Sequence, residues 1–258
     1  VEYPIPPLVC IPTTAGSSAD VSQFAIIADT SRRTKMAIVS KAVVPDVALI
    51  DPQTLTTLSP YQIACTGMDA LTHAIEAYVS TAHSPITDLH ALEAIRLITS
   101  NLPGAVMHPS SLEYQGSMML ASLEAGLAFS NAILGAVHAM AHSLGGYLDL
   151  PHGECNAILL TAVVAFNYSS CPERYDRIAE AMGIVLHPDD GGARKDRLVE
   201  FIANLRNTVG ISPTVGRLGV KKTDIPRLAE FALQDACMAT NPVMMRRGDI
   251  EGIYESIL

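Results

Sequence analysis

The stretch "GMDALTHAIEAY", residues 67–78, has the pattern of a helix that belongs in a protein interior. Small and apolar residues fill most of its positions, but Asp69 and His73 lie one helical turn apart and therefore share a face. A buried carboxylate and a buried imidazole are costly unless each finds a partner. The stretch therefore predicts a core helix that carries part of a polar site.

The helical pattern continues on both sides of this stretch, from Pro52 to the end of the chain. Ser59–Pro60 and Ser84–Pro85 are typical helix starts. Glycine, proline and aspartate predict loops over 187–196 and 207–224. We expect further helices over 111–129, 131–145, 155–168, 172–182, 194–208, 223–238 and 248–257. Residues 53–258 are thus predicted to form an all-helical domain.

The first 52 residues differ from the rest of the chain. Short β-branched runs stand beside turn residues in "PLVCIPTT", "KMAIVS" and "VPDVALIDP", which is the pattern of strands. A few strands without a crossover helix cannot form a doubly wound sheet with both faces covered. We therefore expect a mainly α protein whose helical domain is preceded by a truncated α/β segment, residues 1–52.

Composition limits the classes of partner. The chain has 258 residues and a net charge of −9, so neither nucleic acid nor an anionic membrane surface is expected to bind it. A hydrophobic content of 49% and a mean hydropathy of +0.28 indicate a large core and favour a homo-oligomer with a buried subunit interface, a dimer or larger. Five cysteines without a CxxC motif favour a reducing, cytoplasmic setting.

One segment, residues 125–148, contains no Asp, Glu, Lys or Arg and is long enough to span a bilayer. It also carries Ser130, Asn131, His138 and His142, which lipid would desolvate. We therefore expect this segment to be buried inside a helical protein.

Three histidines gather near the end of this apolar segment: His138, His142 and His152. His138 and His142 are four residues apart, as Asp69 and His73 are, so each pair shares a helix face. Two helices that direct such pairs at one point can form a metal site in a bundle core, with ligands suited to Zn²⁺ or Fe²⁺. Spacing leaves two sets of metal ligands open. Asp69, His73 and His138 can be completed either by His142 or by His152, which lies in the loop "LPHGEC".

Each of these residues also has an explanation without a metal. Thr66 and Asp69 resemble a capping box at a helix start, and His73 alone fits a core histidine with satisfied hydrogen bonds. His138 and His142 alone fit packing positions, and "HAMAH" lacks the Glu of the HExxH motif. Together, however, so many buried polar side chains favour a metal that pairs them.

Several motifs resemble those of the iron-containing (group III) alcohol dehydrogenases, in order and over nearly the whole chain. They are "PTTAG", "KMAIV", "PDVALIDP", "TGMDALTHAIEAYVS", "GLAFSNAILGAVHAMAHSLGG", "PHGECNAILL" and "DACMATNP". The resemblance implies that residues 1–52 are the end of a dinucleotide-binding domain and that 53–258 form a helical iron-binding catalytic domain. The implied metal ligands are Asp69, His73, His138 and His152, which leaves His142 as a candidate proton relay.

The resemblance also implies an NAD- or NADP-dependent oxidoreductase that transfers hydride between a primary alcohol and its aldehyde. Iron is the implied metal, although the ligand types also accept Zn²⁺. The loop "PTTAG" resembles the cofactor loop of the family, and Lys35 resembles a lysine near the cofactor ribose and phosphates. The implied cofactor-binding residues are Thr13, Thr14, Ser17, Ser22, Phe24, Lys35 and Leu55.

Two departures from the family pattern stand out. Ser18 occupies a position where the family has Gly, which tolerates positive φ better than Ser does. The family's "GGGS" phosphate-binding turn is absent, and about a hundred residues of nucleotide domain are expected to be missing before Val1. The alternative is therefore an isolated metal-binding helical domain without dehydrogenase activity. A zinc-dependent relative of the glycerol dehydrogenase or dehydroquinate synthase type fits the motifs less well.

Overall fold

The computed structural model describes residues 6–32, 34–187 and 190–258. Two expectations extend beyond these residues. The segment expected to be rich in strands includes residues 1–5, and the loop expected over 187–196 includes residues 188 and 189. All of these residues lie outside the described part.

Helix α1 (Pro60–Val79) lies at the centre of the molecule, and every residue from Gly67 to Val79 is buried. The helix begins where the sequence indicates, because Ser59 and Gln62 form a capping box and Pro60 occupies the first turn. The interpretation of Thr66 and Asp69 as a helix start is therefore wrong, since both lie inside α1. Helices α2, α3 and α5 pack around it.

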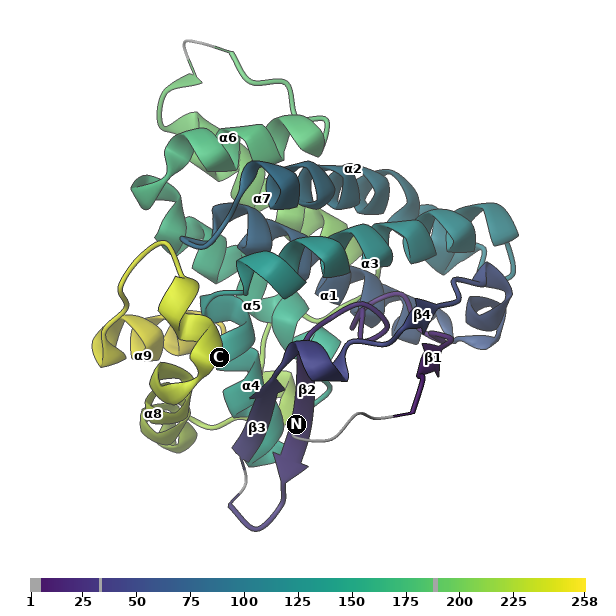
Figure 1. The fold of residues 1–258 in the computed structure, drawn as a ribbon. Helices are drawn as coiled ribbons and strands as arrows, with labels where there is room; N and C mark the ends of the chain where they lie inside the picture. The colour runs from purple at the N-terminus through teal and green to yellow at the C-terminus, as the bar shows by residue number, and fades with distance from the viewer. Residues whose placement is uncertain (1–5, 33, 188–189) are drawn as a thin grey trace.

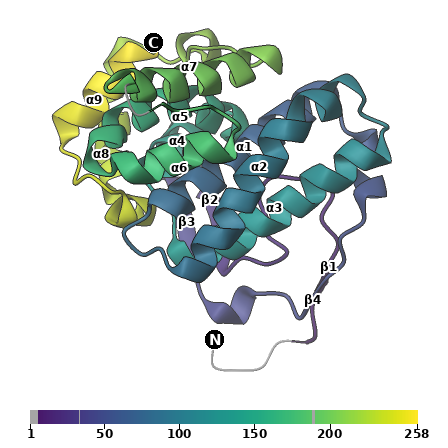
Figure 2. The same cartoon turned by 90° about the horizontal axis from the view of Figure 1, so that it is seen from above.

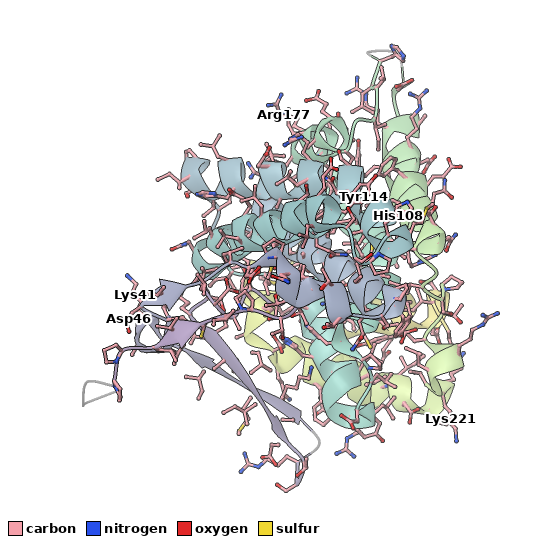
Figure 3. All side chains as sticks on the ribbon, turned by 90° about the vertical axis from the view of Figure 1, so that its right-hand side faces the viewer. Lys41, Asp46, His108, Tyr114, Arg177 and Lys221 are labelled. Atoms are coloured by element: carbon pink, nitrogen blue, oxygen red, sulfur yellow. The ribbon has the colours of Figure 1, made fainter. Side chains whose placement is uncertain are left out.

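Helices α2 (Pro85–Met107) and α3 (Leu112–Ala132) form a long helical hairpin against α1. Figure 2 shows the three helices side by side. At the turn of the hairpin, the His108 ring stacks on Tyr114 with centroids 6.0 Å apart, and Figure 3 shows the two side chains next to each other.

The other helices complete the bundle. They are α4 (Ala136–Leu148), α5 (His152–Asn167), α6 (Pro172–Ala181), α7 (Ala193–Thr208), α8 (Ile225–Gln234) and α9 (Arg247–Ser256). Short 3₁₀ helices are η1 (Lys41–Val43), η2 (Pro52–Thr57), η3 (Tyr168–Ser170), η5 (Gly216–Leu218), η6 (Lys222–Asp224) and η7 (Ala236–Thr240). The single helix expected over 223–238 is thus divided among η6, α8 and η7, because Asp235 ends α8 and caps η7 through the backbone N–H of Cys237.

The apolar segment 125–148 is broken between α3 and α4, whose axes meet at 99°. Ile133, at the break, has a φ of 62°. Among the described residues, no single helix is long and apolar enough to cross a membrane, although α3 and α4 taken together pass that test. The break places the start of α4 inside the bundle, where residues 136–145 are all buried.

The strands form two small sheets, so the fold is mainly α as expected. Strand β1 (Val9–Cys10) pairs in parallel with β4 (Val47–Ala48), Val9 opposite Val47. Strand β2 (Phe24–Asp29) pairs antiparallel with β3 (Thr34–Val39), Phe24 opposite Val39. Figure 1 shows that this hairpin extends beyond the helices. All five cysteines are free.

Candidate metal centre and adjoining cleft

A cavity of about 540 Å³ lies between the β2–β3 hairpin and the helices. Its size is within the range of small-molecule and cofactor sites. All five candidate metal-site residues reach it, together with four of the candidate cofactor residues. These lining residues are Asp69, His73, His138, His142, His152, Ser17, Ser22, Phe24 and Lys35.

Asp69 is the point on which the candidate ligands converge. Its Oδ1 lies 3.6 Å from Nε2 of His138 and 3.7 Å from Nε2 of His152. Two ligand atoms that each lie about 2.1 Å from one ion, at a tetrahedral angle, are about 3.4 Å apart. Ligand atoms of Asp69, His73 and His138 also lie within 4.8 Å of one another. The donors and their spacing therefore fit a divalent ion of the Fe²⁺ or Zn²⁺ type.

The start of α4 is fixed by a buried carboxylate of α1. Glu76 accepts hydrogen bonds from the backbone N–H of Val137 at 2.6 Å and of His138 at 3.4 Å. Asn241 accepts the N–H of Ala136 at 3.1 Å. An anion is favourable at a helix N-terminus, because the first N–H groups of a helix lack intrahelical partners. These contacts hold His138 against α1.

Glu76 also orients the His138 ring, because its Oε2 lies 2.6 Å from Nδ1. A hydrogen bond from Nδ1–H to a carboxylate leaves the Nε2 lone pair for a metal. This role of Glu76 was not predicted from the sequence. The signal was present, since Glu76 follows Asp69 and His73 by seven and three residues and shares their helix face.

His152 is the first residue of α5, and the expectation that it lies in a loop is wrong. Gly153 lets this helix end approach α1 closely, because a Cβ at Gly153 would lie 2.4 Å from the carbonyl oxygen of Cys65. The close approach brings His152 to Asp69.

Asn156, one turn further along α5, contacts three of the candidate ligands. Its amide nitrogen donates to Oδ1 of Asp69 at 2.6 Å and lies 3.2 Å from Nε2 of both His138 and His152. The residue is fully buried. Sequence reasoning missed Asn156 as well, although its position four residues after His152 placed it on the same helix face.

The ionisation of these groups suits a cation. Burial alone would raise the pKa of Asp69, but His73, His152 and His138 hold it well below its usual range. Burial lowers the pKa of His73 to about 3, and it lowers that of His152 well below the ordinary value. Despite burial, hydrogen bonds to Asp69 and Glu76 raise the pKa of His138 to about 9. Asp69 is thus anionic and His73 and His152 are neutral, as metal ligands must be, whereas His138 has to release a proton when an ion binds.

His142 occupies a different position from the other three histidines. Its ring stacks on His152 with centroids 5.2 Å apart, but its Nδ1 lies 2.8 Å from Oδ2 of Asp235. The structure therefore brings His152 to Asp69 and pairs His142 with a residue 93 positions away in the chain.

The cofactor candidates divide into two groups. Ser17, Ser22, Phe24 and Lys35 line the cavity. Thr13, Thr14 and Leu55, all within the described residues, are not among the residues that line it, and Leu55 is a fully buried residue of η2.

Two neighbours shape the cavity wall. Gly145 leaves room for Lys35, because a Cβ there would lie 2.9 Å from its Nζ. Phe129 is buried and also lines the cavity, where its ring stacks on His73 with centroids 4.4 Å apart. Phe166, by contrast, is half-buried against the core and lines a separate cavity.

Ser18 has the backbone conformation for which Gly is better suited than Ser. Its φ is +50°, in the left-handed region that Gly adopts most easily. Its hydroxyl donates to the carbonyl of Ser122 at 2.6 Å, and its own carbonyl accepts from the N–H groups of Val21 and Ser22. The loop therefore keeps a left-handed turn at this residue, with the Ser side chain tied to α3.

Comparisons with known proteins identify relatives of the whole chain. Residues 1–52 match the model of the iron-containing alcohol dehydrogenases, and residues 63–258 match that of the C-terminal domain of the same family. The 1,3-propanediol dehydrogenase of Citrobacter freundii is 43% identical over 255 residues, which are 98% of this chain and 64% of that protein. The NAD-dependent methanol dehydrogenase of Bacillus methanolicus is 37% identical over 100% of this chain and 68% of that protein.

The fold has the same relatives. A crystal structure of a 1,3-propanediol oxidoreductase superposes with a TM-score of 0.97 at 41% identity, covering 100% of this chain and 68% of that one. The chain thus spans somewhat less than two thirds of the Citrobacter freundii enzyme that it resembles.

Proposed function

Because the chain belongs to the iron-containing alcohol dehydrogenase family, we propose that it binds Fe²⁺ and takes part in reversible hydride transfer between a primary alcohol and NAD or NADP. The convergence of Oδ1 of Asp69 with Nε2 of His138 and His152, beside a 540 Å³ cavity, supports this proposal most directly.

We assign the metal to Asp69, His73, His138 and His152, with Glu76 and Asn156 orienting the ligands. A bound ion supplies a Lewis acid that makes an alcohol hydroxyl more acidic and, in the reverse direction, polarises an aldehyde carbonyl. The donor set accepts either Fe²⁺ or Zn²⁺. Family membership favours iron.

His142 is assigned to proton transfer. Since its Nδ1 faces Asp235, Nε2 is the nitrogen left to accept a proton from the substrate side of the cavity. Asp235 keeps the ring in this orientation, and the backbone N–H of Cys237 holds Asp235 at 2.8 Å.

A nicotinamide dinucleotide, the proposed second cofactor, accepts or supplies the hydride. Ser17, Ser22 and Lys35 place two hydroxyls and an ammonium group on the cavity wall. Phe24 and Phe129 form an apolar part of the same wall, with ring centroids 5.9 Å apart. The name of the Bacillus methanolicus relative favours NAD. Thr13, Thr14 and Leu55 remain family-based assignments for the same cofactor.

We further propose that residues 1–52 belong to the dinucleotide-binding domain and residues 53–258 to the iron-binding domain. A homo-oligomer is supported by apolar side chains on the β2–β3 hairpin, where Ile27, Met36 and Ile38 are 47%, 44% and 45% exposed. The five free cysteines support a reducing, cytoplasmic setting.

The test of function is cofactor binding and turnover by this 258-residue chain loaded with Fe²⁺. We expect NADH fluorescence to saturate on titration and short primary alcohols to reduce NAD. His142→Ala provides the control, because it should still bind NADH while turnover falls. If NADH does not bind and no alcohol is oxidised, the alternative of a metal-binding domain without dehydrogenase activity is the correct one.

A further inference from the structure

A second cluster of metal-binding side chains lies beside the first. Ligand atoms of His142, Asp235 and Cys237 lie within 4.8 Å of one another, and none of these residues belongs to the set around Asp69. They offer an imidazole nitrogen, a carboxylate oxygen and a thiol sulfur, and Zn²⁺ binds all three types. We propose that this cluster is a second cation site, selective for thiophilic divalent ions such as Zn²⁺ and Cd²⁺.

The local structure preforms the cluster. Asp235 ends α8, and its Oδ1 accepts the N–H of Cys237 at 2.8 Å, so the carboxylate and the thiol are held on one short turn. His142 approaches from α4, with Nδ1 2.8 Å from Oδ2 of Asp235. An ion bound by both Nδ1 of His142 and Oδ2 of Asp235 replaces the proton that the two atoms share. The two atoms then need to move only slightly further apart.

The cluster is reachable from two sides. His142 and Cys237 line the 540 Å³ cavity. His142 and Asp235 also line a second cavity of about 210 Å³, next to Ser143 and Gln234. An ion can therefore enter through a cavity, and water from either side can complete a tetrahedral shell of three protein ligands.

The charges balance at both sites. A divalent ion at the second site meets the carboxylate of Asp235 and the thiolate of Cys237; at the first site it meets the carboxylate of Asp69, and the carboxylate of Glu76 lies behind His138. Lys35 lines both cavities and opposes a cation, so its charge limits the affinity of the second site.

Binding requires one proton to leave. Burial raises the pKa of the Cys237 thiol well above its usual value, so the sulfur is protonated before an ion arrives. The S–H bond breaks, a sulfur–metal bond forms and the proton passes to solvent. Where Nδ1 of His142 binds the ion, the ring carries its proton on Nε2, and the Cys237 thiol supplies the proton that is released.

This proposal goes beyond the dehydrogenase function and does not depend on it, because its test measures metal binding alone. The full chain is first loaded with one equivalent of Fe²⁺, the ion proposed for the Asp69 site, and then titrated with Cd²⁺, while the ultraviolet thiolate-to-cadmium charge-transfer band is recorded. Cadmium at the Asp69 site produces no such band, because that site contains no sulfur.

We expect a band that saturates with one further equivalent of Cd²⁺ and disappears in Cys237→Ser. Cys65→Ser, which removes another buried cysteine, is the matched control and should keep the band. Asp235→Asn and His142→Ala retain the thiol and should weaken cadmium binding at least about tenfold. Lys35→Met should tighten it. Circular dichroism confirms that each variant is folded. A wild-type protein without the band, or a band that persists in Cys237→Ser, overturns the proposal.

Discussion

Replacing Glu76 by Gln should weaken divalent metal binding while the protein remains folded. Glu76 accepts from Nδ1 of His138 at 2.6 Å and from the N–H of Val137 at 2.6 Å. The amide oxygen of Gln can replace only one of these acceptors. If it keeps the Val137 contact, its NH₂ group faces Nδ1 of His138. The ring then has to accept at Nδ1 and carry its proton on Nε2, which is the nitrogen nearest Asp69.

The magnitude follows from the role of the carboxylate. Loss of a hydrogen-bonding partner behind a metal ligand typically lowers affinity about 10- to 100-fold, or about 1.4 to 2.7 kcal/mol. Removing an anion from a buried helix N-terminus costs up to about 2 kcal/mol of folding stability. The metal dissociation constant should therefore rise by one to two orders of magnitude, with a smaller loss of stability in the ion-free protein.

The assay is competition for Zn²⁺ and Fe²⁺ with a chelator of known affinity. Glu93→Gln is the matched control, because Glu93 lies on the outer face of α2 with its side chain 43% exposed, paired with Arg96. We expect the control to bind metal like the wild type. A Glu76→Gln protein with unchanged metal affinity would refute the reasoning that Glu76 sets the tautomer of His138.

Three further changes test other parts of the structure. A chelator should lower the unfolding temperature measured by calorimetry, because an ion at 100 times its dissociation constant stabilises the fold by about 2.7 kcal/mol; an unchanged temperature would contradict this. Ser18→Ala should lower the free energy of unfolding by about 1 kcal/mol, since it loses the bond to Ser122 but keeps the positive φ, whereas Ser18→Gly should lower it less; denaturant titration giving the reverse order would be evidence against the argument. Gly153→Ala should cost about 1 to 3 kcal/mol and weaken metal binding, because its Cβ displaces α5 from Cys65; a variant with normal stability and metal content would show that α5 has room to spare.

Much of the fold could be predicted from local patterns. Ser59 and Pro60 mark the start of α1, and apolar periodicity marks the helices that follow, because both are properties of neighbouring residues. The end of α8 was not predicted, since it depends on Asp235 binding the backbone of Cys237 instead of continuing the helix.

Local spacing also predicted part of the candidate site, but not the choice between two of its histidines. Spacing placed Asp69 with His73 and His138 with His142, because both pairs are four residues apart. It could not distinguish His142 from His152, since that choice depends on Asp235, 93 residues away, and on the approach of α5 to α1.

Glu76 and Asn156 were missed for a related reason. Each is an ordinary polar residue of a helix until the fold places it behind His138 or Asp69. The only signal in the sequence was that each shares a buried helix face with a predicted metal ligand, where a polar side chain needs a partner.

The most direct test of the metal centre is the iron content of two purified variants, His152→Ala and His142→Ala, each reconstituted with one equivalent of Fe²⁺ and measured by elemental analysis. His152 faces Asp69 and His142 faces Asp235, so we predict that His152→Ala loses the ion and that His142→Ala retains about one per chain. Full occupancy in His152→Ala, or loss of the ion in His142→Ala, would contradict the proposed ligand set.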